Sequence, residues 1–401
     1  MALLPVDEAL ERLLGDAKAI ASETVPLSEC AGRVLAEPVV ALRTQPPFNA
    51  SAMDGYAVRL ADVGSIPARL TVKGIAPAGK QFKGYVGQGE AVRIFTGAPV
   101  PEGADTIVIQ ENVRDLGSDT IEITETVGAG RHIRRRGLDF NEGDVLLEAG
   151  RQLDPAALSL AAAGNHPRLE VVRQPLVAII ATGDELMPPG SETAPDQIIA
   201  SNAYGVGAIA QIAGARVMDL GIARDTKGAI GDLVQAALDA RADVIVTLGG
   251  ASVGDHDLVH DVLTDYGMRL DFWRIAMRPG KPLMFGRVGE TRCIGLPGNP
   301  VASLICAHLF LVPLLSRLGG RPYAPVIEEA RLGEAMAAND HRQDYVRASL
   351  IETGEGLVAT PFQIQDSSML RTFSDADALI IRAPNAPASS RGDTCRVTRL
   401  R

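Results

Sequence analysis

The chain has 401 residues, more than one ordinary hydrophobic core accommodates, so two to four domains are expected. Its composition is that of a soluble globular protein, with 46% hydrophobic, 22% charged and only 4% aromatic residues. The formal net charge of −10 argues against general nucleic-acid binding, which needs a basic face. It leaves room for an anionic small molecule, because a local cationic pocket can form on an acidic protein.

The composition also indicates the compartment. The four cysteines are scattered, without a CxxC pair or metal-ligand spacing, and predict buried free thiols in a reducing cytosol. The N-terminus carries acids early and lacks the pattern of a signal peptide. The most apolar stretch, 304–315, is interrupted by His308 and Pro313 and is too short to span a bilayer, so a buried helix is predicted. We therefore expect a cytoplasmic protein that does not enter a membrane.

The first 172 residues combine two helices with a β-rich insertion. Apolar residues share one face of an N-terminal helix, at Val6, Leu10, Leu13 and Leu14. From Pro46-Pro47 to about Arg136, short apolar runs cut by glycines are typical of a small β-domain, either a barrel or a sandwich. Asp154 and Pro155 then begin a helix over 156–163. Because the β-region interrupts the helical segments, these are expected to form one discontinuous domain.

From Leu176 the pattern alternates between strands and helices. Strands are expected at 177–180, 216–220 and 244–248, with helices from Ser201-Asn202 to about 213 and over 230–238. This rhythm predicts a parallel sheet with helices on both faces. After a linker-like break at 319–322, short strands return and predict a second small β-domain, at 344–351, 357–360, 378–382 and 394–398.

Acids follow three strands of the predicted parallel sheet, where ligands of such sheets bind. They are Asp184 with Glu185, Asp225, and Asp255 with Asp257. Each alone is more often a helix cap or a solvated turn residue, and Asp255 ranks below Asp257 because it can cap the next helix. Together on one edge they indicate a divalent-cation site, since Mg²⁺ favours a few carboxylates plus phosphate oxygens.

Backbone turns and cations suited to an anion accompany these acids. The glycine-rich turn 249–254 lets a ligand approach main-chain N–H groups closely. The turn 297–300 opens a long apolar helix, with Asn299 as N-cap and Pro300 at the first position, so its free N–H groups are expected to face an anion. Three cations surround Pro279-Gly280, namely Arg274, Arg278 and Lys281. The stretch therefore predicts a phosphate-binding, metal-assisted site.

Other motifs carry less weight. Residues 250–254 match the bare Gly-x-Ser-x-Gly pattern of hydrolases, but the acids just after them suit a metal better than a nucleophile. The nearest approach to a P-loop, 74–80, continues with Gln81, and a dinucleotide fingerprint is lacking. The four arginines within 131–136 are typical of a solvated edge. Because Asp139 is nearby, a position at the margin of a binding site remains an alternative.

Five motifs in order resemble the MoeA and gephyrin E-domain family of molybdopterin molybdenumtransferases. They are Ser51-Ala52-Met53-Asp54-Gly55-Tyr56-Ala57, Thr182-Gly183-Asp184-Glu185-Leu186, Gly249-Gly250-Ala251-Ser252-Val253-Gly254, Arg278-Pro279-Gly280-Lys281-Pro282 and Leu296-Pro297-Gly298-Asn299-Pro300-Val301. The resemblance covers essentially the whole chain. It implies a multidomain α/β plus β fold with a central three-layer α/β molybdopterin-binding domain (173–321), an inserted β-domain (46–140), a discontinuous helical N-terminal domain (1–45 plus 141–172) and a C-terminal β-barrel (322–401).

The resemblance also implies an activity and a set of site residues. The reaction is Mg²⁺-dependent insertion of molybdate into adenylated molybdopterin with release of AMP, the last step of molybdenum cofactor biosynthesis. The expected partners are a second subunit in a homodimer with shared active sites, the adenylylating enzyme and apo-molybdoenzymes. By this likeness Asp54, Thr96 and Asp139 reach across the dimer interface, and the Mg²⁺ ligands are Glu185, Asp225 and Asp257. The expected substrate contacts are Thr182, Gly249, Gly250, Ser252, Gly254, Arg274, Arg278, Lys281, Pro297, Gly298, Asn299, Pro300, Arg347 and Ser367.

Two departures and two alternatives remain. Family members often carry lysines where this chain has Arg274 and Arg278, and Asp-Asn where it has Asn49-Ala50. The first keeps charge but changes geometry, because a guanidinium is a planar fork and an ammonium a point charge. One alternative is a molybdopterin adenylyltransferase, which shares the central domain type. The other is a non-catalytic scaffold like gephyrin.

Overall fold

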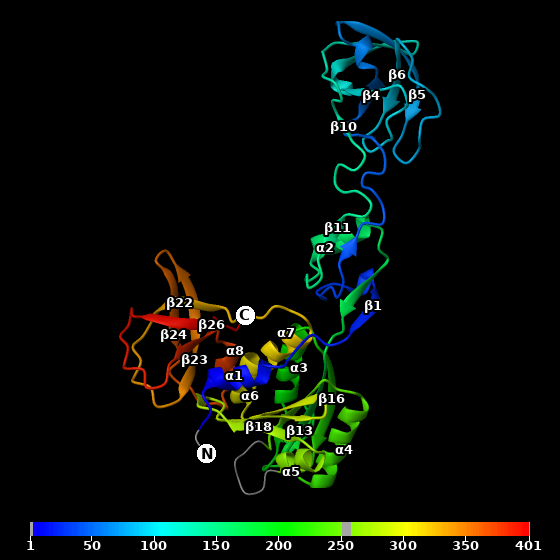
Figure 1. The fold of residues 1–401 in the computed structure, drawn as a ribbon. Helices are drawn as coiled ribbons and strands as arrows, with labels where there is room; N and C mark the ends of the chain where they lie inside the picture. The colour runs from blue at the N-terminus through cyan, green and yellow to red at the C-terminus, as the bar shows by residue number, and fades with distance from the viewer. Residues whose placement is uncertain (1–2, 251–257, 401) are drawn as a thin grey trace. The chain divides into compact units, whose positions relative to one another are not determined.

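The computed structural model describes residues 3–250 and 258–400 of the chain (Figure 1). The chain divides into two compact units. Unit 1 comprises Met1–Glu23, Gly32–Val34 and Val171–Arg401, and unit 2 comprises Thr24–Ala31 and Leu35–Glu170. The four cysteines, at positions 30, 293, 306 and 395, are buried free thiols, as their scattered spacing predicts.

A six-stranded sheet forms the centre of unit 1, in the order β16-β13-β17-β21-β20-β18. The strands are β13 (Leu176–Thr182), β16 (Arg216–Ala223), β17 (Val244–Leu248), β18 (Arg269–Arg274), β20 (Pro282–Val288) and β21 (Thr291–Leu296). The first four in this order run parallel, and β20 and β18 extend the sheet by antiparallel pairing. The predicted parallel sheet is therefore confirmed.

Helices cover both faces of this sheet because the side chains of β13 alternate between two cores. Val177 and Ile179 pack with α1 (Val6–Leu14), α3 (Asn202–Ile212) and the helix that begins at Pro300. Ala178 and Ile180 pack with α4 (Lys227–Asp239) and α5 (Leu258–Asp265). All four strand residues are 0% exposed, as expected of a strand buried on both faces. Figure 1 shows α4 and α5 on the side of the sheet opposite α1.

The helix after Pro300 is longer than its apolar pattern suggests. It runs through α6 (Pro300–Cys306), a π-helical turn (Ala307–Leu311) and α7 (Val312–Leu318), so Pro313 does not end it. The widened turn lies just before Pro313, which lacks an amide donor. Among the described helices it alone has the length and composition to cross a membrane, but 78% of its apolar window is buried inside the structure. The prediction of a buried core helix is confirmed.

A closed five-stranded barrel forms the C-terminal part of unit 1. Its strands are β22 (Ile327–Leu332), β23 (Gln343–Thr353), β24 (Gly356–Pro361), β25 (Ala378–Arg382) and β26 (Thr394–Arg399). Pairing of β23 with both β24 and β25 closes the barrel. A short strand from the central domain, β19 (Met277–Arg278), adds to β23, and α8 (Leu370–Ser374) follows a loop that reaches α6.

Unit 2 contains the predicted small β-domain. Six strands pair in the order β7-β4-β6-β5-β9-β8. They are β4 (Gly55–Val58), β5 (Ala68–Ala76), β6 (Glu90–Ile94), β7 (Thr106–Ile109), β8 (Val113–Gly117) and β9 (Thr120–Ile123), with 3₁₀ turns at Leu27–Glu29, Leu60–Asp62 and Gln110–Asn112. Neighbouring residues of β4 enter different apolar clusters, Val58 one and Ala57 the other. Both faces of the sheet are therefore covered.

The segment before the β-domain pairs with the segment after it through short strands. The pairs are β1 (Ser22–Pro26) with β12 (Arg168–Val172), β2 (Val39–Val40) with β11 (Val145–Leu147), and β3 (Ala50–Ser51) with β10 (Ile133–Arg134). Helix α2 (Pro155–Ala163) begins as predicted, with the Asp154 side chain accepting a 2.8 Å bond from the Ala157 amide.

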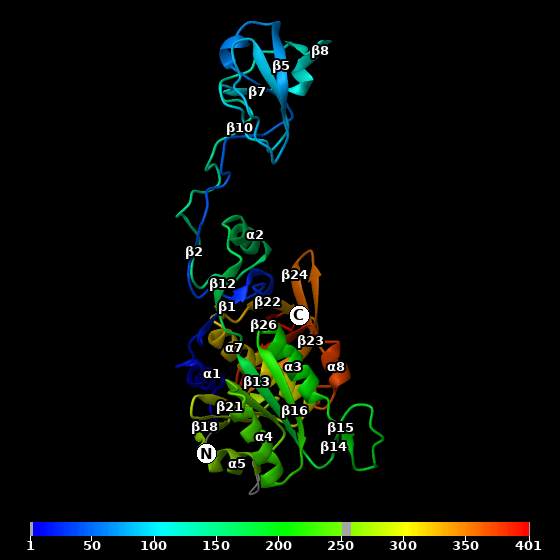
Figure 2. The same cartoon turned by 90° about the vertical axis from the view of Figure 1, so that its right-hand side faces the viewer.

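Helix α1 belongs to unit 1, and Figure 2 shows it beside α7. Val6, Ala9 and Leu13 of α1 are buried in the core of unit 1, where α1 packs against α7. The apolar face of α1 therefore covers the central sheet. Residues on both sides of the insertion pair through strands.

Candidate functional site

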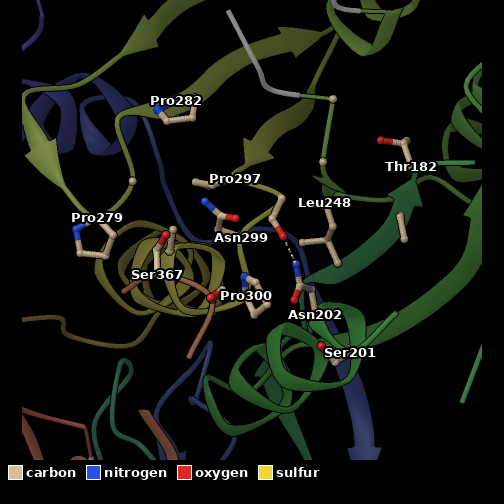
Figure 3. A pocket seen from close by; sticks show the side chains of 18 of the residues that line it. Thr182, Ser201, Asn202, Leu248, Pro279, Pro282, Pro297, Asn299, Pro300 and Ser367 are labelled. Atoms are coloured by element: carbon tan, nitrogen blue, oxygen red, sulfur yellow. Dashed lines mark hydrogen bonds between the residues drawn. The ribbon is translucent and has the colours of Figure 1, made fainter. Parts of the chain in front are cut away.

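A cavity of about 1320 Å³ opens at the carboxyl ends of β13, β17 and β21 (Figure 3). Its walls come from the loops after these strands, from the turn between β19 and β20, and from residues 365–368 of the barrel. A volume of this size admits a ligand larger than most drug-sized molecules. The position is the one expected for ligands of a parallel α/β sheet. We call this cavity the rim pocket.

Two glycines and a threonine form the floor of the rim pocket. Gly249 and Gly250 follow β17 with φ of 93° and 64°, a region that side chains disfavour. A Cβ on Gly249 would lie 2.8 Å from the Thr182 carbonyl oxygen, and one on Gly250 would lie 2.3 Å from Val259 Cγ2. The Thr182 Oγ1 is buried and has no hydrogen-bond partner in the part of the chain that the structure describes, although Thr182 lines the pocket. An unsatisfied buried hydroxyl beside a cavity favours a ligand that bonds to it.

The turn Pro297–Pro300 lies against this floor. The Gly249 amide donates to the Leu296 carbonyl at 3.3 Å, and the Asn202 side-chain amide donates to the Gly298 carbonyl at 2.8 Å, as Figure 3 shows. The sequence pattern assigns Asn202 to a helix cap and misses this contact. Neither Ser201 before α3 nor Asn299 before α6 makes a side-chain cap bond.

The start of α6 is less open to an anion than expected. Pro300 has no N–H group, and the Val301 amide donates to the Ser367 carbonyl at 3.0 Å. The expectation of free N–H groups at this helix start is therefore wrong for Val301, because the barrel loop bonds to it. This bond brings Ser367 to the rim pocket, where the sequence prediction places it.

Carboxylates that follow β13 and β16 gather at the pocket. The Asp225 amide donates to Asp184 Oδ1 at 3.2 Å, and both Glu185 and Asp225 line the cavity. Loss of hydration raises the pKa of Asp225, and the charges of Asp184 and Glu185 add to this rise. None of the described ion pairs involves these three acids, and the nearby Lys227 pairs with Asp261 and Asp265. Their oxygens suit a divalent cation such as Mg²⁺, which prefers oxygen ligands.

The structure describes only part of the expected Mg²⁺ site. Asp257 lies outside the described residues, as do Ser252 and Gly254, which were expected to contact substrate. In residues 3–250 and 258–400, no three His, Cys, Asp or Glu side chains are grouped as a metal site requires. Glu185 and Asp225 thus supply two carboxylates of the predicted set.

The three expected cations have different surroundings. Lys281 is exposed and lines the rim pocket, and the described part of the chain offers it no carboxylate partner. Arg278 also lines the pocket, but its guanidinium pairs with Asp344 and Asp340 of the barrel. Arg274 ends β18 and is not among the described residues that line the cavity.

Arg347 is buried behind the barrel loop and does not line the pocket. Its side chain is 1% exposed; Nε donates to Gln365 Oε1 at 3.0 Å and Nη1 to the Asp366 carbonyl at 2.8 Å. Burial lowers the pKa of Arg347. Gln365 and Asp366 line the cavity, so Arg347 shapes its wall through them. Neither residue belongs to a motif, and no sequence signal pointed to them.

The remaining expected residues belong to unit 2. Asp54 Oδ1 accepts hydrogen bonds from both the amide and the hydroxyl of Thr96, each at 2.8 Å. These bonds hold the pKa of Asp54 below its usual range. Asp139 is exposed, and its amide donates to the Gln45 carbonyl. The four arginines of the 131–136 run are exposed as well, which fits a solvated edge.

Comparison with known proteins covers nearly the whole chain. Family models match in order, as the MoeA N-terminal region (domain I and II) over 4–164, a probable molybdopterin binding domain over 178–317, and the MoeA C-terminal region (domain IV) over 329–400. The crystal structure of a molybdopterin biosynthesis MoeA protein from Pyrococcus horikoshii matches with a TM-score of 0.84 and 31% identity, covering 100% of both chains.

Curated relatives agree. A molybdopterin molybdenumtransferase of Haemophilus influenzae is 33% identical over 98% of both chains. A molybdopterin molybdenumtransferase 2 of Mycobacterium tuberculosis is 39% identical over 89% of this chain and 90% of its own length. One from Nostoc is 37% identical over 82% of this chain and 77% of its own. With its α/β sheet, its closed C-terminal barrel and these matches, the chain belongs to the MoeA family of molybdopterin molybdenumtransferases.

Proposed function

We propose that the chain inserts molybdate into adenylated molybdopterin with release of AMP, as the last step of molybdenum cofactor biosynthesis. The observation that supports this most is the rim pocket, which brings the glycine floor, the carboxylates, Lys281 and the barrel loop around one cavity. Its volume of about 1320 Å³ accommodates a substrate that carries both a phosphate and a nucleotide. The names of the curated relatives point to the same reaction.

Each wall of the pocket has a role in this proposal. The hydroxyl of Thr182 binds a phosphate oxygen, because it is a buried hydrogen-bond donor on the cavity wall with no partner among the described residues. The two glycines after β17 leave room for the phosphate, since neither carries a side chain. Lys281 attracts an oxyanion, since it lines the pocket and has no carboxylate partner among residues 3–250 and 258–400. The dithiolene sulfurs of the substrate take the molybdenum, so the buried cysteines have no part in the reaction.

The proposal includes Mg²⁺, held by Glu185, Asp225 and Asp257. A bound Mg²⁺ would neutralise charge on the phosphoanhydride as AMP leaves. Glu185 and Asp225 fit this ion in their chemistry, because they are oxygen ligands on the cavity wall. Loss of hydration raises the pKa of Asp225, and the negative charges of Asp184 and Glu185 raise this pKa further. A cation would relieve that repulsion.

The decisive experiment measures AMP release from adenylated molybdopterin, with and without molybdate and Mg²⁺. The variant Lys281→Met is compared with Lys18→Met, an exposed lysine outside the rim pocket. We expect molybdate-dependent AMP release that falls at least about tenfold in the first variant and is kept in the second. Consumption of ATP on molybdopterin would instead identify an adenylyltransferase, and ligand binding without either reaction would identify a scaffold.

We also propose a homodimer in the cytoplasm, with Asp54, Thr96 and Asp139 of one subunit completing the site of the other. The support is the family resemblance, in which active sites are shared between subunits. Asp54→Asn and Lys281→Met proteins, each strongly reduced in activity when alone, are mixed and allowed to exchange subunits. Shared sites would restore about a quarter of wild-type activity, because half of the dimers are mixed and each has one intact site. Sites within one subunit would give no recovery. Contacts with the adenylylating enzyme and with apo-molybdoenzymes belong to the same proposal.

A further inference from the structure

The turn at Pro279–Pro282 is held at both ends by different domains of unit 1. On one side, β19 pairs with the barrel strand β23, with Met277 opposite Gln343 and Arg278 opposite Asp344. On the other side, Pro282 opens β20 of the central sheet. Every residue of this turn lines the rim pocket. The turn therefore takes its position from the docking of the barrel on the central domain.

The guanidinium of Arg278 makes the side-chain contacts of this junction. Nε donates to Asp344 Oδ2 at 3.1 Å, and Nη2 donates to the same oxygen and to Asn339 Oδ1 at 3.3 Å. Nη1 lies 3.6 Å from Asp340 Oδ2. The bond to Asp344 raises the pKa of Arg278. The planar fork thus spans three barrel residues at once, which a single ammonium group could not do.

The barrel residues are fixed in turn. Asp340 also accepts from Arg342, with its Oδ2 2.7 Å from Nη2, and the Asn339 amide donates to the carbonyls of Arg342 and Ala383 at 2.7 and 2.8 Å. Two arginines and two aspartates therefore form a network of zero net charge. The positive charge of Arg278 is compensated within the protein, whereas that of Lys281 faces the pocket without a partner among the described residues.

The turn has little freedom to compensate for a shift of β19. Gly280 has a φ of 109°, and a Cβ there would lie 2.4 Å from the Cys306 Sγ of α6. The Ile275 amide donates to the Lys281 carbonyl at 3.1 Å. A displacement at Arg278 is therefore passed on to Lys281, because the turn packs tightly on α6 and is bonded across its base.

We propose that Arg278 is a positioning residue, which with Asp344 clamps the turn to the barrel and so sets the place of Lys281 opposite the barrel loop. Lys281, three residues on, recognises the anionic substrate. The clamp replaces the expected role of Arg278 as a direct contact. The kinetic test of the clamp rests on the proposed function, whereas its test by hydrogen exchange does not depend on activity.

The variant Asp344→Asn separates the two roles because they predict opposite effects. A substrate-binding Arg278 would gain free charge when Asp344 is neutralised, and the KM for anionic substrate would stay or fall. The clamp predicts that the KM rises about tenfold in Asp344→Asn and in Arg278→Met, with no further rise in the double variant. Arg278→Lys is expected to keep the charge without restoring the KM. A lower or unchanged KM in Asp344→Asn, or multiplying effects in the double variant, would overturn the clamp.

Hydrogen exchange tests the clamp without any reaction. The amides to follow are those of Ile275 and Gln343, which donate to the carbonyls of Lys281 and Ala276 at 3.1 and 2.8 Å. In Asp344→Asn both are expected to exchange at least about tenfold faster than in the wild type. Glu328→Gln is the matched control, since Glu328 holds Arg399 at 2.6 Å in the same barrel and neither residue lines the pocket. Unchanged exchange in Asp344→Asn, or equal acceleration in the control, would refute the clamp. Failure of AMP release in the wild type would refute the proposed function alone.

Discussion

Gly249→Ala tests the floor of the rim pocket, because it forces a methyl group against the Thr182 carbonyl oxygen. The substitution places a methyl group at φ of 93°, for which an L-residue is destabilised by roughly 1–2 kcal/mol. The same methyl carbon lies 2.8 Å from the Thr182 carbonyl oxygen, which is backbone and cannot turn aside. Overpacking of this kind costs about 1–3 kcal/mol. We expect a total loss of about 2–5 kcal/mol in the free energy of unfolding.

Gly267→Ala is the matched control for backbone strain. Gly267 follows α5 with a φ of 85°, and a Cβ there meets no atom within 4 Å. It therefore carries the strain without the collision, and we expect a loss of about 1–2 kcal/mol. The difference between the two variants isolates the contact with Thr182.

Urea unfolding followed by tryptophan fluorescence measures both losses. Trp273 is the only tryptophan of the chain and packs in the core of unit 1, so its emission reports on the unit that holds the pocket. The change in free energy follows from the shift in midpoint at constant slope. Equal midpoint shifts for the two variants would refute the placement of Gly249 against the Thr182 carbonyl.

Three further outcomes follow from single contacts. Thr96→Val removes a donor that lowers the pKa of Asp54, so that pKa rises towards its unfolded-state value. The stability that this carboxylate contributes above the unfolded-state pKa becomes smaller, and its loss as pH falls is complete at a higher pH than in the wild type. Carboxyl NMR titration checks this, and Thr96→Ser should show no rise. Ser303→Ala is expected to raise the free energy of unfolding by about 1 kcal/mol, because it removes a buried hydroxyl that has no partner among the described residues. A lower melting temperature than that of the wild type would contradict this. Asp225→Asn should raise the Mg²⁺ concentration for half-maximal AMP release about tenfold, and Asp196→Asn, exposed outside the pocket, should not.

Local sequence patterns determined the elements that carry the site. Strand β17 is apolar at every position but Thr247 and ends in two glycines, and the structure places this strand in the middle of the parallel sheet. The acids at Asp184, Glu185 and Asp225 follow strand ends, and the carboxyl ends of parallel strands share one edge. Periodicity and turn chemistry are properties of neighbouring residues, so they are visible in the sequence itself.

Only the tertiary structure decided which charged groups face the cavity. Arg278 and Lys281 lie in one motif and carry the same charge. Arg278 is neutralised by Asp344, 66 residues further on, whereas Lys281 has no carboxylate partner among the residues that the structure describes. Arg347 is turned into the barrel and acts through Gln365, while Ser367 bonds to the start of α6. The packing of α1 on α7 was decided in the same way. These outcomes depend on contacts between distant segments, which form only when the barrel and the central sheet pack together and which no local pattern encodes.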